Sequence, residues 1–363
     1  MMAIQQKICA YCIVCIVALL LSCSGSIAQT TTAKKAAFVF RVPYGKELNK
    51  IGVQWADKFE GGAPYNESAC GITVLPDGDI TIGDFVQGKI KRFSPKGQLL
   101  GVTEGWAGVV SSYSTDSDGN VYVSAELSVV KYSKDGHLLW KKEEIELVPN
   151  SEYIKTEKEM NCKIDRTFGG LVDVSKEGWV IINMGAKVVN DKFSREIGVV
   201  LDDNGKFIKF LPYFPRVSGN LFWTFKIENN VKNDNEPPGP TTINLFSEKG
   251  TLIKEFKLDL TCDNGIHYKQ RLGEGGVNIF ADNKDNIWVK CRAILDKPIE
   301  IKKGVTINRE YLLNKYDING AFLEELRLPY SPFMSDANFT VADDGTLYYM
   351  QFDKDGINVM AYK

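Results

Sequence analysis

Short β-rich stretches and tight turns alternate along most of the chain. Six times, a turn centred on glycine, aspartate or asparagine precedes a run of β-branched and aromatic residues, as Gly119-Asn120 precedes Val121-Tyr122-Val123. Glycine, asparagine and aspartate tolerate the positive φ angles of tight hairpins, whereas β-branched and aromatic residues favour strands. The six turns and their first strand residues span 76–80, 117–121, 176–180, 217–221, 283–287 and 343–347.

A second turn follows the first in five of the six copies, and each second turn ends in a glycine. These glycines are Gly97, Gly136, Gly205, Gly250 and Gly320. The repeated unit is therefore four strands joined by hairpins. Four-stranded antiparallel units of roughly 40 to 60 residues are typical of propeller blades. The pattern predicts an all-β fold, a six-bladed β-propeller of four-stranded antiparallel blades.

The sixth copy has three strands and stops at Lys363, before any second turn. The missing strand is available near the other end of the chain, where 37–42 (Ala-Phe-Val-Phe-Arg-Val) matches the last strands of the other copies. Pairing the two ends would close the ring and protect the edge of the last sheet. We therefore expect one propeller domain over 37–363, with its last blade completed by the N-terminal strand.

The first copy resembles a blade of the NHL-repeat and TolB-like six-bladed propellers. The resemblance rests on 72–80 (Ile-Thr-Val-Leu-Pro-Asp-Gly-Asp-Ile) and 90–97 (Ile-Lys-Arg-Phe-Ser-Pro-Lys-Gly), and the same pattern runs through the rest of the domain. It implies the fold alone, because those families contain binding modules, lactonases and lyases.

The first residues are typical of an export signal. Lys7 precedes an apolar stretch at 8–21, which is too short to favour a membrane span. Two endings compete. Leu-Leu-Ser-Cys at 20–23 resembles a bacterial lipobox, which would end the signal at residue 22 and leave Cys23 lipidated. The small-x-small pattern at 26–28 would end it at residue 28 instead, with 29–36 as a short linker. We expect an exported protein, either secreted into the periplasm or held at the cell envelope as a lipoprotein.

Composition and charge limit the classes of partner that the chain is expected to bind. The net charge is −2, and acidic and basic residues are interspersed. This argues against nucleic acid as a partner and against a polybasic membrane patch. Membrane contact is expected only through an N-terminal lipid, and the chain is expected to be a monomer. Two histidines exclude a histidine-rich zinc or copper site.

The connections predict which side of the domain binds. In a blade, the turns after the first and third strands lie on one face, here named the turn face. The links after the second and fourth strands lie on the other, the connection face. Long segments are usually functional or disordered, and tolerated surface insertions are the alternative reading of any single one. Here all of the long segments belong to the connection face. They span 44–69, 143–168, 185–197, 228–240, 259–275 and 292–309.

Candidate site residues follow from this face. Aromatic and basic side chains that would anchor a ligand are Trp106, Arg166, Arg216, His267, Tyr268, Arg271 and Tyr330. The resemblance to lactonase-type propellers implies a divalent ion on the axis, for which calcium suits oxygen ligands. Residues at comparable strand ends are Glu67, Asp84, Glu126, Asn183 and Asp336. Solvated surface carboxylates are the alternative reading.

Four cysteines lie beyond the signal: Cys70, Cys162, Cys262 and Cys291. Export permits disulfides, and Cys262–Cys291 is the first candidate pair; buried thiols are the alternative. No complete catalytic constellation is visible, since the sequence has neither a GxSxG elbow nor a P-loop. The leading hypothesis is a recognition propeller without a cofactor that binds a protein, peptide or glycan. The alternative is a calcium-dependent hydrolase of the lactonase type, and a structural surface-layer component is a third reading.

The expected pairing of the two ends is testable by truncation. A chain beginning at residue 45 should unfold at a markedly lower temperature than the mature chain, because the sixth blade would lose a strand. Calorimetry measures both. Equal melting temperatures would contradict the pairing.

Overall fold

The computed structural model describes residues 36–363 apart from several gaps, and Ala36–Lys363 forms one compact unit. The gaps are 57–64, 68, 104–111, 126–127, 176–177, 189–193, 212–213, 219–220, 228–240, 247–251, 259–278, 283, 285, 303–304 and 329–338. Among the described residues, no helix combines the length and the apolar character that crossing a membrane requires.

The described strands form six four-stranded antiparallel sheets, which we number in chain order. Sheet 1 contains β4 (Ala69–Val74), β5 (Ile80–Asp84), β6 (Lys89–Phe93) and β7 (Leu99–Thr103). Sheet 2 contains β8 (Ser112–Thr115), β9 (Val121–Ala125), β10 (Ser128–Tyr132) and β11 (Leu138–Glu143). Sheet 3 contains β12 (Cys162–Val174), β13 (Val180–Val188), β14 (Ser194–Leu201) and β15 (Phe207–Leu211).

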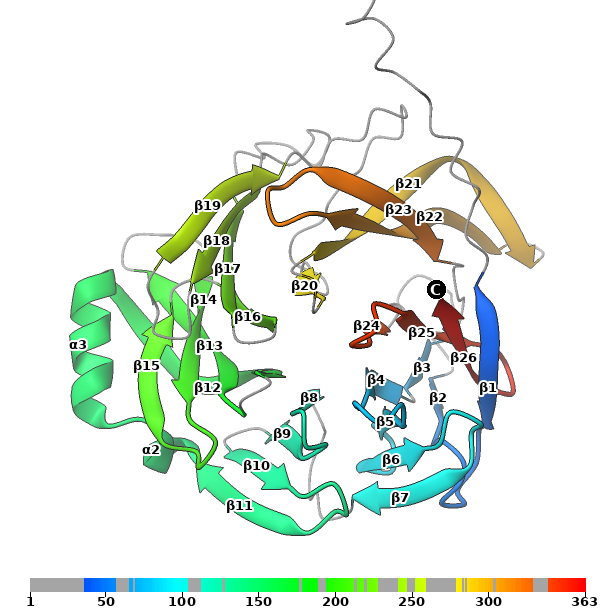
Figure 1. The fold of residues 1–363 in the computed structure, drawn as a ribbon, viewed down its shortest axis with the longest axis horizontal. Coiled ribbons are helices and arrows are strands. Elements are labelled where there is room, and N and C mark those ends of the chain that lie inside the picture. The colour runs from blue at the N-terminus through cyan, green and yellow to red at the C-terminus, as the bar shows by residue number, and fades with distance from the viewer. Residues whose placement is uncertain are drawn as a thin grey trace, which may run out of the picture. The chain divides into compact units, whose positions relative to one another are not determined.

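The remaining sheets follow the same order. Sheet 4 contains β16 (Phe214–Ser218), β17 (Leu221–Ile227), β18 (Thr241–Phe246) and β19 (Leu252–Leu258). Sheet 5 contains β20 (Ile279–Ala281), β21 (Ile287–Lys302), β22 (Val305–Tyr316) and β23 (Phe322–Leu328). Sheet 6 contains β24 (Phe339–Val341), β25 (Leu347–Phe352), β26 (Gly356–Tyr362) and β1 (Ala37–Pro43). Each sheet places its first strand nearest a common centre, so the domain is an all-β propeller with four-stranded antiparallel blades (Figure 1).

The strand β1 pairs with β26, as the repeat pattern predicts. The antiparallel register runs from Ala37 opposite Ala361 to Pro43 opposite Gly356. Phe40 and Val42 point into an apolar cluster that includes Ile80 of sheet 1 and Val359 of sheet 6. The N-terminal strand therefore contributes both a ladder and core side chains to sheet 6.

Hairpins on the turn face have the predicted chemistry. In the turn between β6 and β7, the Gly97 N–H donates to the Ser94 carbonyl at 2.8 Å, and Gly97 has a φ of 80°. Register shifts directly after the turn, where Phe93 pairs with Leu99, which marks a hairpin with a bulge. A Cβ on Gly97 would lie 2.8 Å from Phe40, so close approach also excludes other residues.

Neighbouring sheets are joined through these turns. Asp203, in the turn between β14 and β15, reaches back to sheet 2, where the Lys131 ammonium pairs with its carboxylate. The Tyr122 hydroxyl lies 2.9 Å from the same carboxylate, and the Trp140 indole N–H donates to the Asp203 backbone carbonyl at 2.9 Å. One turn residue thus links two sheets by charge and hydrogen bonding.

Three predicted loops are regular structure. The segment 143–168 was predicted as a loop but contains α2 (Glu144–Leu147), α3 (Asn150–Met160) and the start of β12. The segment 185–197 is mostly extension of β13 and β14, and 292–309 is mostly β21 and β22. In addition, 44–69 contains the two-stranded pair β2 (Gln54–Ala56) and β3 (Tyr65–Glu67).

The helix α3 has a clear local cause. Its sequence is rich in glutamate and lysine, it begins after Pro149, and Asn161 ends it in a left-handed conformation with a φ of 48°. Tyr153 is buried against Phe210, at 5.5 Å between ring centroids, and fixes the helix to sheet 3.

Two phenylalanines on β1 give a matched test of its contribution to stability. Phe40 is 5% exposed and Phe38 is 61% exposed. Phe40→Ala should lower the free energy of unfolding by about 3–5 kcal/mol, because it opens a cavity in the core. Phe38→Ala should change it by less than about 0.5 kcal/mol. Urea denaturation measures both, and equal effects would contradict the packing of β1.

Candidate recognition face

The best-described part of the connection face is a loop that follows β1. Residues 43–52, here named the 43–52 loop, lie between sheets 6 and 1. The Ile51 N–H donates to the Pro43 carbonyl at 3.0 Å and the Gly45 N–H to the Ile51 carbonyl at 2.9 Å, so the two ends of the loop are held together. Its start is also joined to sheet 6, because the Tyr44 N–H donates to the Asp355 carbonyl at 3.1 Å.

A buried ion pair holds this loop from below. Asp84 ends β5 and Lys91 lies on β6; their side chains are 2.7 Å apart and fully buried. The Lys91 ammonium also donates to the Lys50 carbonyl and, at 3.2 Å, to the Gln87 side chain. The Asp84 carboxylate accepts the Gly52 N–H at 2.8 Å and the Gln87 N–H at 3.0 Å. Both charged groups therefore have their hydrogen-bond partners within the protein.

Burial lowers the pKa of Lys91, and the ion pair with Asp84 opposes that shift. A buried charge is tolerated only when its partner and its hydrogen bonds are in place. The loop carbonyl of Lys50 and the loop N–H of Gly52 are two of those partners. The position of the 43–52 loop is thus coupled to the stability of sheet 1.

The exposed surface above this ion pair mixes apolar and charged side chains. Leu48, in the 43–52 loop, is 49% exposed, and Val86, in the turn between β5 and β6, is 38% exposed. Gly52 lies against Val86, because a Cβ there would be 2.9 Å from the Val86 side chain. On the sheet 6 side, Arg41 pairs with Asp353 at 2.7 Å. The charged side chains described at this surface are paired with each other, Arg41 with Asp353 and Lys50 with Glu47.

The predicted metal ligands are distributed as follows. Asp84 is engaged by Lys91, as described. Asn183, on β13 of sheet 3, is 2% exposed, and its side-chain oxygen has no hydrogen-bond partner among the described residues. Glu67 lies on β3, whereas Glu126 and Asp336 lie outside the described residues. Within the described part of the chain, no three His, Cys, Asp or Glu side chains gather as a metal site.

The structure describes only some of the other predicted site residues. Arg166 lies on β12, and Arg216 lies on β16 opposite Trp223 of β17. Cys291 lies on β21, and Cys162 is buried in the core shared by sheets 2 and 3. The remaining residues fall outside the described ranges: Cys23, Trp106, Cys262, His267, Tyr268, Arg271 and Tyr330.

Lys91 and Gln87 are central to this site, and the sequence analysis missed both. Lysine is rarely buried, so a lysine on a strand suggests an outward-facing side chain. A usable signal was present: Asp84 pairs with Lys89 across the hairpin, and Lys91, two residues further along β6, lies on the same face within reach of a long side chain.

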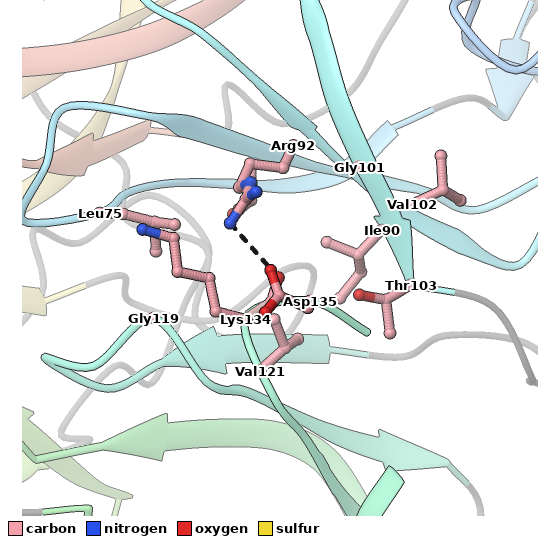
Figure 2. Close-up of a pocket in the computed structure, with 11 residues that line it drawn as sticks. Leu75, Ile90, Arg92, Gly101, Val102, Thr103, Gly119, Val121, Lys134 and Asp135 are labelled. Carbon is pink, nitrogen blue, oxygen red and sulfur yellow. Dashed lines mark hydrogen bonds between the residues drawn. The ribbon is translucent and has the colours of Figure 1, made fainter. Parts of the chain in front are cut away.

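A small cavity lies elsewhere, between sheets 1 and 2 (Figure 2). Its volume is about 10 Å³, enough for about one water molecule. Arg92 lines it and donates to the Lys134 carbonyl at 3.4 Å. It is too small for an organic ligand, so this cavity is not a candidate binding pocket.

Comparison with known proteins finds no matching family model and no matching curated protein. Similar solved structures include a gluconolactonase from Xanthomonas campestris, with 11% identity over 91% of this chain and 99% of that chain and a TM-score of 0.46. A luciferin-regenerating enzyme has 12% identity, coverage of 86% and 96%, and a TM-score of 0.46. A calcium-binding regucalcin from Agrobacterium tumefaciens has 13% identity, coverage of 80% and 88%, and a TM-score of 0.43. These likenesses concern the fold.

The buried ion pair can be tested by a double-mutant cycle. Lys91→Met leaves Asp84 buried without its cation and should lower the free energy of unfolding by about 3–5 kcal/mol. Asp84→Leu should cost a similar amount, and the double variant should cost less than the sum of the two. Denaturant titrations measure all three variants.

The control for this cycle is Lys50→Met, which removes an exposed ion pair with Glu47. Its effect should stay below about 1 kcal/mol. Additive effects of Lys91→Met and Asp84→Leu would show that the pair is not coupled.

Proposed function

We propose that this chain is an exported recognition propeller that binds a protein, peptide or glycan on its connection face. The observation that carries the proposal is the unequal elaboration of the two faces. The described links on the turn face are short turns, many of them built on a glycine with positive φ. The connection face has the 43–52 loop, the β2–β3 pair, the helices α2 and α3, and the long strands β21 and β22.

We further propose that the six sheets are the blades of a closed ring, with sheet 6 next to sheet 1. Contacts at this junction support it. Gly97, in the turn between β6 and β7, lies against Phe40 on the outermost strand of sheet 6. Gly136 of sheet 2 lies against Thr103 of sheet 1 in the same manner, and Gly205 of sheet 3 lies against Trp140 of sheet 2. A ring makes the connection face one continuous surface.

Recognition is favoured over hydrolysis by the state of Asp84. A carboxylate that already accepts Lys91 and two backbone N–H groups offers little to a divalent ion. Elemental analysis of the purified mature chain provides a direct check. A stoichiometric divalent ion, with a melting temperature that falls on chelation, would favour the metal-dependent hydrolase instead.

The recognition face can be tested with paired surface variants. Envelope protein extract and an immobilised glycan panel serve as probes for the mature chain. Leu48→Glu combined with Val86→Glu should weaken retention by at least about tenfold, because binding would bury two carboxylates that have no charge partner. Pull-down and array signals measure retention.

The matched control changes two exposed leucines on the outer strand of sheet 2. Leu138 and Leu139 are 60% and 51% exposed. Leu138→Glu combined with Leu139→Glu should leave retention unchanged. Equal losses from both pairs, or no retained ligand of any class, would contradict a binding site on the connection face.

A further inference from the structure

The strands β21 and β22 extend beyond the other two strands of their sheet. β20 pairs only with residues 287–289 of β21, and β23 pairs only with residues 311–316 of β22. From Ala293 opposite Glu310 to Lys302 opposite Val305, β21 and β22 pair with each other alone among the described strands. This two-stranded part, residues 293–310, is named the arm. Figure 1 shows β21 running well past the end of β20.

The two edges of the arm differ. The β21 edge contains Pro298, which has no N–H to offer, and its register shifts between Ile294 and Ile299. Prolines, bulges and lysines are the features by which proteins protect an exposed edge against pairing. The β22 edge over 305–310 reads Val-Thr-Ile-Asn-Arg-Glu, without proline or glycine, and both register shifts of the arm, at Ile294/Ile299 and at Glu300/Lys302, place their extra residues on β21. Among the described residues, these protective features lie on the β21 edge of the arm and not on the β22 edge.

The sequence that follows β23 is unsuited to continue the ladder along the β22 edge. β23 ends with Leu328 opposite Tyr311, so Pro329 would have to pair with Glu310. Pro332 follows three residues later. Neighbouring positions of a strand present their N–H groups to opposite sides, so two prolines three residues apart interrupt pairing on either side. The described ladder between β23 and β22 ends at Leu328 opposite Tyr311, where the arm begins.

We propose that the β22 edge of the arm, residues 305–310, binds an extended peptide segment of a partner protein as an added strand. Six residues are the length of an ordinary strand. The backbone N–H and C=O groups would supply affinity, and alternate side chains would supply selectivity, as in other cases of strand addition. The inference rests on the proposed recognition function and narrows its ligand class to polypeptide.

The test uses the full mature chain and a phage-displayed library of random linear dodecapeptides. A matched variant replaces 294–309 by Asn-Gly, a two-residue turn that keeps Ala293 opposite Glu310 and leaves sheet 5 intact. The wild-type chain should enrich peptides at least about a hundredfold over the variant, with equal melting temperatures. With an enriched peptide bound, amide hydrogen exchange over 305–310 should slow at least about tenfold.

Two single variants locate the edge. Thr306→Pro and Ile307→Pro remove N–H groups that face opposite sides of β22. One of them should abolish peptide binding while exchange over β21 stays unchanged, and the other should disturb β21. Equal enrichment by the arm-replaced variant, or protection confined to β21, overturns the inference. The inference is also overturned if the only effect of these variants is a loss of self-association.

These outcomes separate the inference from the function on which it rests. Retention of a glycan or protein that is lost with Leu48→Glu and Val86→Glu, but kept by the arm-replaced variant, leaves the recognition function standing and overturns the peptide edge. Absence of any ligand for the whole connection face overturns both.

Discussion

The antiparallel ladder between β1 and β26 is the constraint on which the rest of the domain depends. It joins strands from opposite ends of the chain in one sheet, and it brings Phe40 and Val42 into a core shared with sheet 1. The same strand leads directly into the 43–52 loop, so the ladder also determines where that loop begins. In this way the packing of sheet 6 positions the exposed surface of the connection face.

The repeat could be predicted because its signal is local. A glycine with positive φ at Gly97, Gly119 or Gly345 is needed wherever the hairpin forms, so each turn is visible in the residues themselves. The pairing of β1 with β26 was predictable by counting strands. The helix α3 was not predicted, because Tyr153 and Thr156 are its buried residues and the segment has no apolar stripe at helical spacing.

The candidate site was less predictable, since its main residues act through long-range contacts. Asp84 was identified as a possible ligand for an ion, and the structure assigns it a protein cation instead. Lys91 is buried only because a loop from another sheet covers it and offers the Lys50 carbonyl. The arm was predicted as a loop because a two-stranded ribbon beyond a sheet has no partner that the blade pattern would reveal.

The buried pair of Asp84 and Lys91 also limits how the sequence can vary over time. Loss of either partner leaves one buried charge with neither a counter-charge nor water around it. The free-energy cost approaches the whole stability of many domains. Replacement of both residues by apolar ones, one substitution at a time, passes through a variant with such an unpaired buried charge. Among homologues, positions 84 and 91 should therefore change together, and Gly52, whose backbone binds Asp84, should change with them only where the loop itself is rebuilt.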